Sequence, residues 1–134
     1  MRNKILFLIL LLIISGCSPI NKNLDSFANC LAEKGVKEYG AFWCPNCAKQ
    51  EKMFGSSFKI IKEKVYNECD PRCDVKDIKD LPIACRGKLG VTETCLAEKV
   101  DRYPTWEFPN GKRLVGVQEF KNLAEESGCE FNEQ

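Results

Sequence analysis

The stretch that decides the fold is residues 39–47, Tyr-Gly-Ala-Phe-Trp-Cys-Pro-Asn-Cys, continued by residues 48–54. Its apolar and aromatic start predicts a buried strand, and the residues after it favour a helix. Pro45 suits the first helical turn, where the backbone N–H has no partner to lose. The pattern therefore predicts a strand, a Cys-x-x-Cys pair and a helix in direct succession, with the two cysteines at the helix N-terminus.

This arrangement favours reversible disulfide chemistry. The partial positive charge at a helix N-terminus stabilises a thiolate on Cys44, and a thiolate is the nucleophile in disulfide exchange. Cys47 lies within reach to resolve the mixed disulfide that forms. We therefore predict a thiol–disulfide oxidoreductase in which Cys44 exchanges with the substrate and Cys47 resolves.

Two other interpretations of the Cys-x-x-Cys stay open. It can be one more structural disulfide in a non-catalytic binding lipoprotein, or part of a thiolate metal carrier. The chain contains no histidine, so a zinc site would need further cysteines or carboxylates. The same absence excludes Cys-His and Ser-His-Asp catalysis. We expect neither a cofactor nor a bound metal.

The first residues predict export. An unbroken apolar run at residues 5–14 follows a short basic head, and it is too short for an ordinary membrane-spanning helix. It ends in Ser15-Gly16-Cys17, which resembles the bacterial lipobox and implies cleavage before Cys17 with lipid on its thiol. A plain anchor helix or an ordinary signal peptide is the alternative. We expect a lipoprotein signal peptide at 1–16, a lipidated tether at 17–23 and one domain at 24–134.

The composition fits an exported protein that binds no nucleic acid. Basic and acidic residues number 20 and 19, so no basic excess exists to bind a phosphate backbone. Nine cysteines in a small chain indicate an oxidising compartment and a disulfide framework. We therefore expect an exported bacterial lipoprotein on the extracytoplasmic (periplasmic) side, held at the membrane by its lipid anchor alone.

The rest of the chain predicts an α/β domain. Helices are expected at about 27–34, 44–54, 93–99 and 117–127, with Asp25 or Ser26 capping the first and Thr92 the third. Strands are expected at 36–42, 65–69, 101–108 and 113–115, the last two joined by a turn at 109–111. Residues 70–92 are rich in turn signals and indicate an insertion held by a local disulfide.

A strand, a Cys-x-x-Cys on a helix with Trp43 just before it, Tyr103-Pro104-Thr105 ahead of a hairpin, and a closing helix together resemble the thioredoxin-fold family. Four blocks, residues 27–31, 39–45, 103–108 and 127–129, narrow the resemblance. More narrowly, they are similar to the thioredoxin-like domain associated with bacterial vitamin K epoxide reductase homologues, in a free-standing form. The resemblance implies a central mixed sheet flanked by helices. It also implies electron transfer between cysteine-containing secreted proteins and a membrane quinone-linked enzyme, which would here be a separate protein.

The resemblance also implies roles for residues around the dithiol. A cis peptide bond before Pro104 would expose the Tyr103 backbone to an extended substrate chain. Trp43 is expected to shield the dithiol and contact the substrate, and Pro45 to help position it. Phe42, in contrast, is expected in the core.

Two residues leave alternatives open. Glu38 lies where thioredoxins keep a buried acid that moves protons for the resolving cysteine, and a surface glutamate paired with Lys34 or Lys37 is the alternative. Asn46 stands where the family commonly has histidine, and a neutral amide does not stabilise a thiolate as a protonated histidine does. The resemblance favours oxidation of substrates, and a reductase or isomerase is the alternative.

The other six cysteines are expected to form structural disulfides. The proposed pairs are Cys30–Cys129, Cys69–Cys95 and Cys73–Cys85. Two of them rest on the resemblance and the third on elimination, since six cysteines allow fifteen pairings. The alternative for Cys73–Cys85 is a second redox pair that passes electrons to Cys44 and Cys47.

Overall fold

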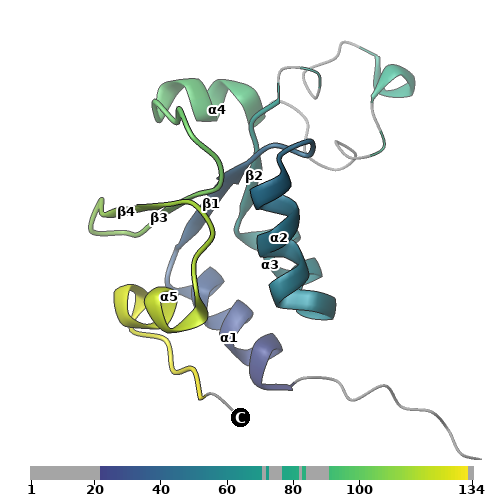
Figure 1. The fold of residues 1–134 in the computed structure, drawn as a ribbon. Coiled ribbons are helices and arrows are strands. Elements are labelled where there is room, and N and C mark those ends of the chain that lie inside the picture. The colour runs from purple at the N-terminus through teal and green to yellow at the C-terminus, as the bar shows by residue number, and fades with distance from the viewer. Residues whose placement is uncertain (1–21, 71, 73–76, 82, 84–90, 133–134) are drawn as a thin grey trace, which may run out of the picture.

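The computed structural model describes residues 22–70, 72, 77–81, 83 and 91–132. Its four strands form one sheet in the order β2–β1–β3–β4 (Figure 1). They are β1 (Lys37–Gly40), β2 (Tyr66–Glu68), β3 (Thr105–Glu107) and β4 (Arg113–Val115). Strand β1 pairs with β2 in parallel and with β3 in antiparallel orientation, and β3 pairs with β4 in antiparallel orientation. The sheet is therefore mixed, as predicted.

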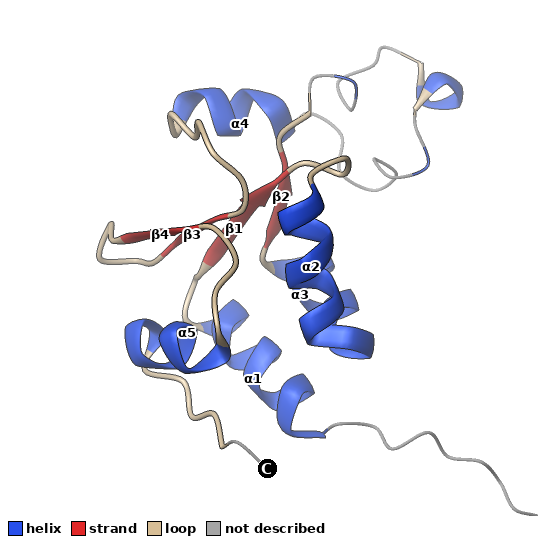
Figure 2. Cartoon of the chain, in the orientation of Figure 1, coloured by secondary structure: helices blue, strands red, loops and turns tan. Residues whose placement is uncertain are grey.

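Helices cover both faces of this sheet (Figure 2). They are α1 (Lys22–Glu33), α2 (Pro45–Phe54), α3 (Phe58–Lys64), α4 (Val91–Ala97) and α5 (Phe120–Ser127). Single 3₁₀ turns lie at Gly55–Ser57 and Ile78–Asp80. Helix α4 lies above the sheet in this view, and α1 and α5 lie below it. A mixed sheet between helices, with the Cys-x-x-Cys at the start of α2, is a thioredoxin-like fold, which confirms the predicted fold class.

The main core lies on the face of the sheet that α1, α2, α3 and α5 cover. Phe27, Phe54 and Phe120 come from three different helices, and the Phe54 and Phe120 ring centroids are 4.8 Å apart. A smaller cluster of Tyr39, Cys69 and Cys95 lies on the other face, beside α4. Because successive strand residues point to opposite faces, Glu38 and Gly40 point towards α2, whereas Tyr39 points towards α4.

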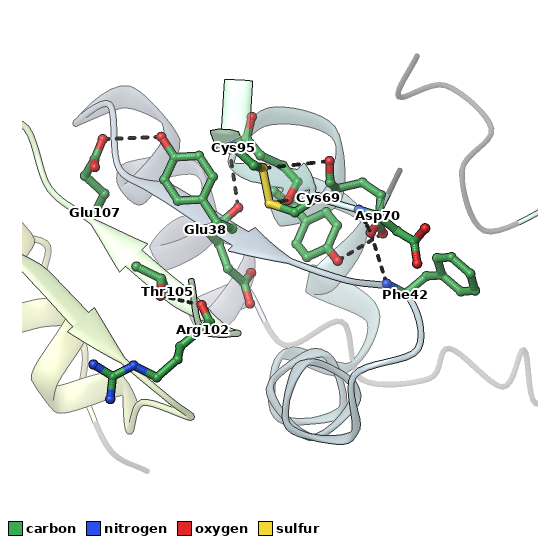
Figure 3. Close-up of a disulfide and its surroundings, with 12 residues drawn as sticks. Glu38, Phe42, Cys69, Asp70, Cys95, Arg102, Thr105 and Glu107 are labelled. Carbon is green, nitrogen blue, oxygen red and sulfur yellow. Dashed lines mark hydrogen bonds between the residues drawn. A yellow bond between two sulfur atoms is a disulfide. The ribbon is translucent and has the colours of Figure 1, made fainter. Parts of the chain in front are cut away.

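Two disulfides join distant parts of the described chain. Cys30 in α1 bonds to Cys129 after α5, across a sequence separation of 99 residues. Cys69, at the end of β2, bonds to Cys95 in α4 (Figure 3). Both pairings are those expected above. The expected Cys73–Cys85 pair, the signal peptide and Cys17 lie outside the described residues.

The first helix begins earlier than predicted. Helix α1 starts at Lys22, so Asp25 and Ser26 lie inside it and cap nothing, and residues 22–23 of the expected tether are helical. The apolar positions Leu24, Phe27 and Leu31 follow helical spacing, which extends the buried stripe towards the N-terminus. Thr92 likewise lies inside α4, which begins at Val91.

Two further elements are shorter than predicted. Strand β3 begins at Thr105, because Pro104 has no N–H to donate to a strand ladder. Helix α5 begins at Phe120 and not at residue 117, because the backbone groups of Gln118 bond to a side chain of α2. The Gln118 N–H donates to Gln50 Oε1 at 2.7 Å, and Gln50 Nε2 donates to the Gln118 carbonyl at 3.1 Å. This reciprocal pair ties α2 to the segment ahead of α5.

Candidate active site

Cys44 is the N-cap residue of α2. The chain leaves β1 at Gly40 and turns, and the Cys44 N–H donates to the Ala41 carbonyl at 2.9 Å. Cys44 itself has an extended backbone (φ −77°, ψ 120°), and Pro45 is the first residue of the helix. Its thiol therefore lies at the helix N-terminus, where the first-turn N–H groups have no partner within the helix.

Cys44 and Cys47 are the free thiols among the described cysteines, and each side chain is 7% exposed. Burial raises the pKa of the Cys47 thiol far above its usual value. A backbone hydrogen bond at Ala41 opposes this rise, and the neighbouring Cys44 and Glu38 add to it. Cys47 therefore becomes a nucleophile only by passing its proton to a base.

The segment before β3 faces the dithiol. The Tyr103–Pro104 peptide bond is cis, as the resemblance implied. The Cys44 thiol donates to the Tyr103 carbonyl oxygen across 3.7 Å, so the Cys44 sulfur lies directly against this backbone. Pro104 is buried, and its carbonyl accepts the Gly116 N–H at 2.8 Å, which fixes the segment to the end of β4.

An aromatic rim surrounds the dithiol. Trp43 is 55% exposed, and its ring meets the edge of the Tyr103 ring at a centroid distance of 6.2 Å. The Trp43 indole N–H donates to the Asp70 carboxylate. The Arg72 guanidinium donates to the same carboxylate at 2.8 Å and lies over the Phe42 ring, 4.6 Å from its centroid. Side chains that follow β2 therefore hold the rim in place.

The expectation that Phe42 is a core residue is wrong. Its side chain is 37% exposed. Phe42 lies beyond the last paired residue of β1, where the chain has left the sheet and the core beneath it. The Phe42 N–H instead donates to Glu68 Oε1 at 3.1 Å, and this bond fixes the approach to Cys44 (Figure 3).

Glu38 is a buried acid beneath the site. It is 0% exposed, and among the described residues neither carboxyl oxygen has a hydrogen-bond partner. Burial raises the pKa of Glu38 to about 8, with the negative charge of Glu51 adding to the effect. The alternative of a surface glutamate paired with Lys34 or Lys37 is therefore wrong. The negative charge of Glu38 in turn adds to the rise in the pKa of Cys47.

Replacing Glu38 by leucine should stabilise the protein mainly at alkaline pH. Below about pH 4.5 the Glu38 carboxyl is neutral in both the folded and the unfolded chain. Between pH 4.5 and about 8 only the unfolded chain releases this proton, so the unfolding free energy falls as pH rises. We expect the gain in unfolding free energy from Glu38→Leu to be about 3 kcal/mol larger at pH 8 than at pH 5. Urea denaturation at both pH values measures it, and an equal gain at both would show that Glu38 ionises normally in the folded chain.

The sequence did not point to the residues of β2 and its end that support the site. Tyr66, Glu68, Asp70 and Arg72 lie at the edge of the turn-rich region, which carried no recognisable motif. The available signal was the alternation of Tyr66 and Glu68 on one face of a strand that pairs with β1. In the described ranges, no group of three or more His, Cys, Asp or Glu side chains is arranged to hold a metal ion.

Comparison with known proteins identifies a relative of known activity. The chain is 33% identical over 119 residues, 89% of its length, to the thiol-disulfide oxidoreductase LTO1 of Arabidopsis thaliana. The chain is similar to a thiol-disulfide oxidoreductase.

The similarity has a defined extent. The chain spans about a quarter (27%) of the length of that relative, so the likeness concerns one part of a longer protein. No known family profile matches the chain. None of the helices in the described ranges is both long enough and apolar enough to span a membrane.

Proposed function

We propose that this chain is an extracytoplasmic thiol–disulfide oxidoreductase that exchanges disulfides with cysteine-containing secreted proteins. The observation that carries the proposal is the free Cys44–Cys47 dithiol at the N-terminus of α2, lying against the carbonyl of Tyr103 before the cis Pro104. The similarity to a thiol-disulfide oxidoreductase supports the same chemistry.

The reaction runs through one mixed disulfide. A substrate thiolate attacks the Cys44 sulfur of the oxidised pair, the Cys44–Cys47 bond breaks, and Cys47 leaves as a thiolate that takes up a proton. A second substrate thiolate then attacks the substrate sulfur of the mixed disulfide. The substrate disulfide forms, and Cys44 leaves as a thiolate beside the N-terminus of α2. The reverse sequence reduces a substrate.

Three groups orient the substrate in this proposal. The backbone at Tyr103 pairs with an extended substrate segment, as the resemblance implies, and Pro104 holds that backbone next to Cys44. The exposed Trp43 ring covers the dithiol and offers an apolar surface to the substrate. Pro45 starts α2 and thereby fixes the turn that carries Cys44. Glu38 exchanges a proton with Cys47 from below.

The membrane setting and the redox partner are part of the proposal. Cleavage before Cys17 and lipid on its thiol would hold the domain at the extracytoplasmic surface. A separate quinone-linked enzyme of the vitamin K epoxide reductase type would reoxidise Cys44 and Cys47. The supports are the lipobox-like sequence 15–17 and the resemblance stated above. Labelling with a radioactive fatty acid in a bacterial host, compared with Cys17→Ser, tests the anchor.

Oxidation of a reduced, unfolded model protein tests the activity. The oxidised chain should remove two substrate thiols per molecule, as thiol titration measures. If it instead accelerates reduction of insulin by dithiothreitol and leaves reduced substrate unchanged, the alternative reductase direction holds. If neither reaction exceeds that of the Cys44→Ser variant, the enzyme proposal fails.

Asn46 is expected to limit the oxidising strength of the pair. A protonated histidine beside a thiolate stabilises the reduced form, whereas the neutral Asn46 amide does not. We therefore expect Asn46→His to raise the reduction potential of the pair by about 30 mV, which is a tenfold change in equilibrium constant. Glutathione titration measures it, with Asn46→Gln as the uncharged control. An equal potential for both variants would contradict this account of Asn46.

A further inference from the structure

A pocket opens beside Cys47. Its volume is about 130 Å³, and residues of α2, α3 and β2 line it without Tyr103 or Pro104. Phe42, Ala48, Glu51 and Lys62 form its exposed rim. The buried side chains of Cys47, Tyr66 and Glu68 also line it. The pocket therefore connects the resolving cysteine to solvent by a route separate from the segment at Tyr103.

Tyr66 and Glu68 lie side by side on this route. They are alternate residues of β2 and point to the same face of the sheet. The Tyr66 hydroxyl donates to Glu68 Oε2 at 3.2 Å. The other oxygen, Glu68 Oε1, accepts the N–H groups of Phe42 and Asp70, each at 3.1 Å. Glu68 is thus a hydrogen-bonded carboxylate with a fixed orientation.

The Tyr66 hydroxyl and the Cys47 sulfur both approach Gly40. A Cβ atom added to Gly40 would stand 2.8 Å from the Tyr66 oxygen and 2.9 Å from the Cys47 sulfur. Both atoms therefore crowd the same point over Gly40, and any side chain at residue 40 would clash with them. Cys47, Tyr66 and Glu68 thus lie together on the wall of the pocket, with the Tyr66 hydroxyl bonded to Glu68.

Glu38 has no comparable connection to solvent. It is completely buried and does not line the pocket, so a proton that it takes from Cys47 remains inside the protein. Disulfide formation releases protons to solvent, and disulfide opening takes them up. The pocket that Cys47 lines together with Tyr66 and Glu68 is the route on which these protons reach solvent.

We propose that Tyr66 and Glu68 relay the proton of Cys47 between its thiol and the solvent in this pocket. The Cys47 S–H proton passes to the Tyr66 oxygen while the Tyr66 proton passes to Glu68 Oε2. Cys47 becomes a thiolate, Tyr66 stays neutral and Glu68 becomes a neutral acid that releases its proton to water in the pocket. The Cys47 thiolate then attacks Cys44, the Cys44–Cys47 bond forms and the substrate leaves as a thiolate. This inference rests on the proposed function.

The charges around the relay agree with this direction. Burial raises the pKa of Glu68, against hydrogen bonds from Asp70, Phe42 and Tyr66, so its carboxylate accepts a proton more readily than an exposed glutamate does. Burial also raises the pKa of Tyr66, which keeps its hydroxyl neutral. The charged and titratable groups that face the relay are Glu38 from β1, Glu51 from α2, Lys62 from α3 and Asp70 after β2.

A two-step reaction with an aromatic disulfide reagent, dithiobis(nitrobenzoate), isolates the relayed step. Attack by Cys44 releases the first coloured thiolate, and resolution by Cys47 releases the second. In Tyr66→Phe we expect the second rate at pH 7 to fall about tenfold or more while the first is unchanged, since positioned proton transfer contributes at least that much. Glu68→Gln should slow the same step, and the increase of the second rate with pH should occur at higher pH than in the wild type. In both variants the loss should shrink at alkaline pH, where hydroxide removes the Cys47 proton directly.

Tyr39→Phe is the matched control. Tyr39 is likewise a buried strand tyrosine that donates to a glutamate, Glu107, at 3.3 Å, but its side chain lies on the opposite face of the sheet, in the cluster with Cys69 and Cys95. Equal second rates in Tyr66→Phe and Tyr39→Phe, or equal slowing of both steps, would overturn the relay. If the wild-type chain itself releases no second thiolate, the proposed function fails. If instead the wild type completes both steps and Tyr66→Phe completes them at the same rates, only the relay fails.

Discussion

Cys44→Ser is expected to reduce disulfide exchange to the rate of buffer alone, whereas Cys47→Ser should stop the reaction at the mixed disulfide. Cys44 is the sulfur that lies against the Tyr103 carbonyl at the N-terminus of α2, and a serine hydroxyl at that position forms no disulfide. Cys47 is buried behind it, so its loss leaves the first attack intact and removes the resolving thiol.

The two variants are distinguished by what they trap. After incubation with a disulfide-containing substrate, Cys47→Ser should migrate as a covalent complex on non-reducing gels and return to the free chain on reduction. Cys44→Ser should form no such complex. Asn46→Ala is the control, because it changes a residue between the two cysteines and keeps both thiols. It should complete the exchange and accumulate no covalent complex. A complex formed by Cys44→Ser and absent from Cys47→Ser would reverse the assigned roles.

Removing the Cys30–Cys129 bond, by alanine at both positions, should lower the unfolding free energy by about 3–5 kcal/mol. The bond closes a separation of 99 residues, and long loops gain the most from a cross-link because the unfolded chain loses the most freedom. Cys129 also packs in the main core, where Phe131 lies 5.3 Å from the Phe27 ring. Urea denaturation of oxidised protein measures the loss.

The second disulfide provides the comparison. Cys69–Cys95 closes only 26 residues, so its removal should cost about 1 kcal/mol less by the same loop argument. The Cys30–Cys129 variant should keep disulfide exchange wherever it is folded, because α1 and the C-terminal segment lie away from the dithiol (Figure 1). An unchanged urea midpoint, or loss of exchange in a folded variant, would contradict this division between stability and activity.

The parts of the site that sequence revealed are those with distinctive chemistry. Cys44, Cys47 and Pro104 belong to residue types that bear directly on covalent chemistry or backbone geometry. The fold class followed from the strand–cysteine–helix succession and from the resemblance. The Cys30–Cys129 pair followed from the same source, since spacing alone leaves the pairing open.

The parts that sequence did not reveal depend on how strands meet. Whether Glu38 is buried depends on the pairing of β1 with β2 and β3 and on α2 above it. The placement of Phe42 on the surface follows from where β1 stops pairing. The Tyr66–Glu68 pair lies near Cys47 only because Gly40 has no side chain, which lets Cys47 and the Tyr66 ring both approach the backbone there. Each is a contact between segments far apart in the sequence.

The central claim is that Cys44 and Cys47 form a reversible redox pair, distinct from the structural disulfides. The most direct test is glutathione titration of the oxidised chain, with alkylation of free thiols and mass spectrometry to identify each opened pair. We expect Cys44–Cys47 to open first, at a potential between about −270 and −120 mV, the range of thioredoxin-fold redox proteins. Opening together with or after Cys30–Cys129, or at a potential below about −300 mV, would make the pair a structural disulfide and contradict the account.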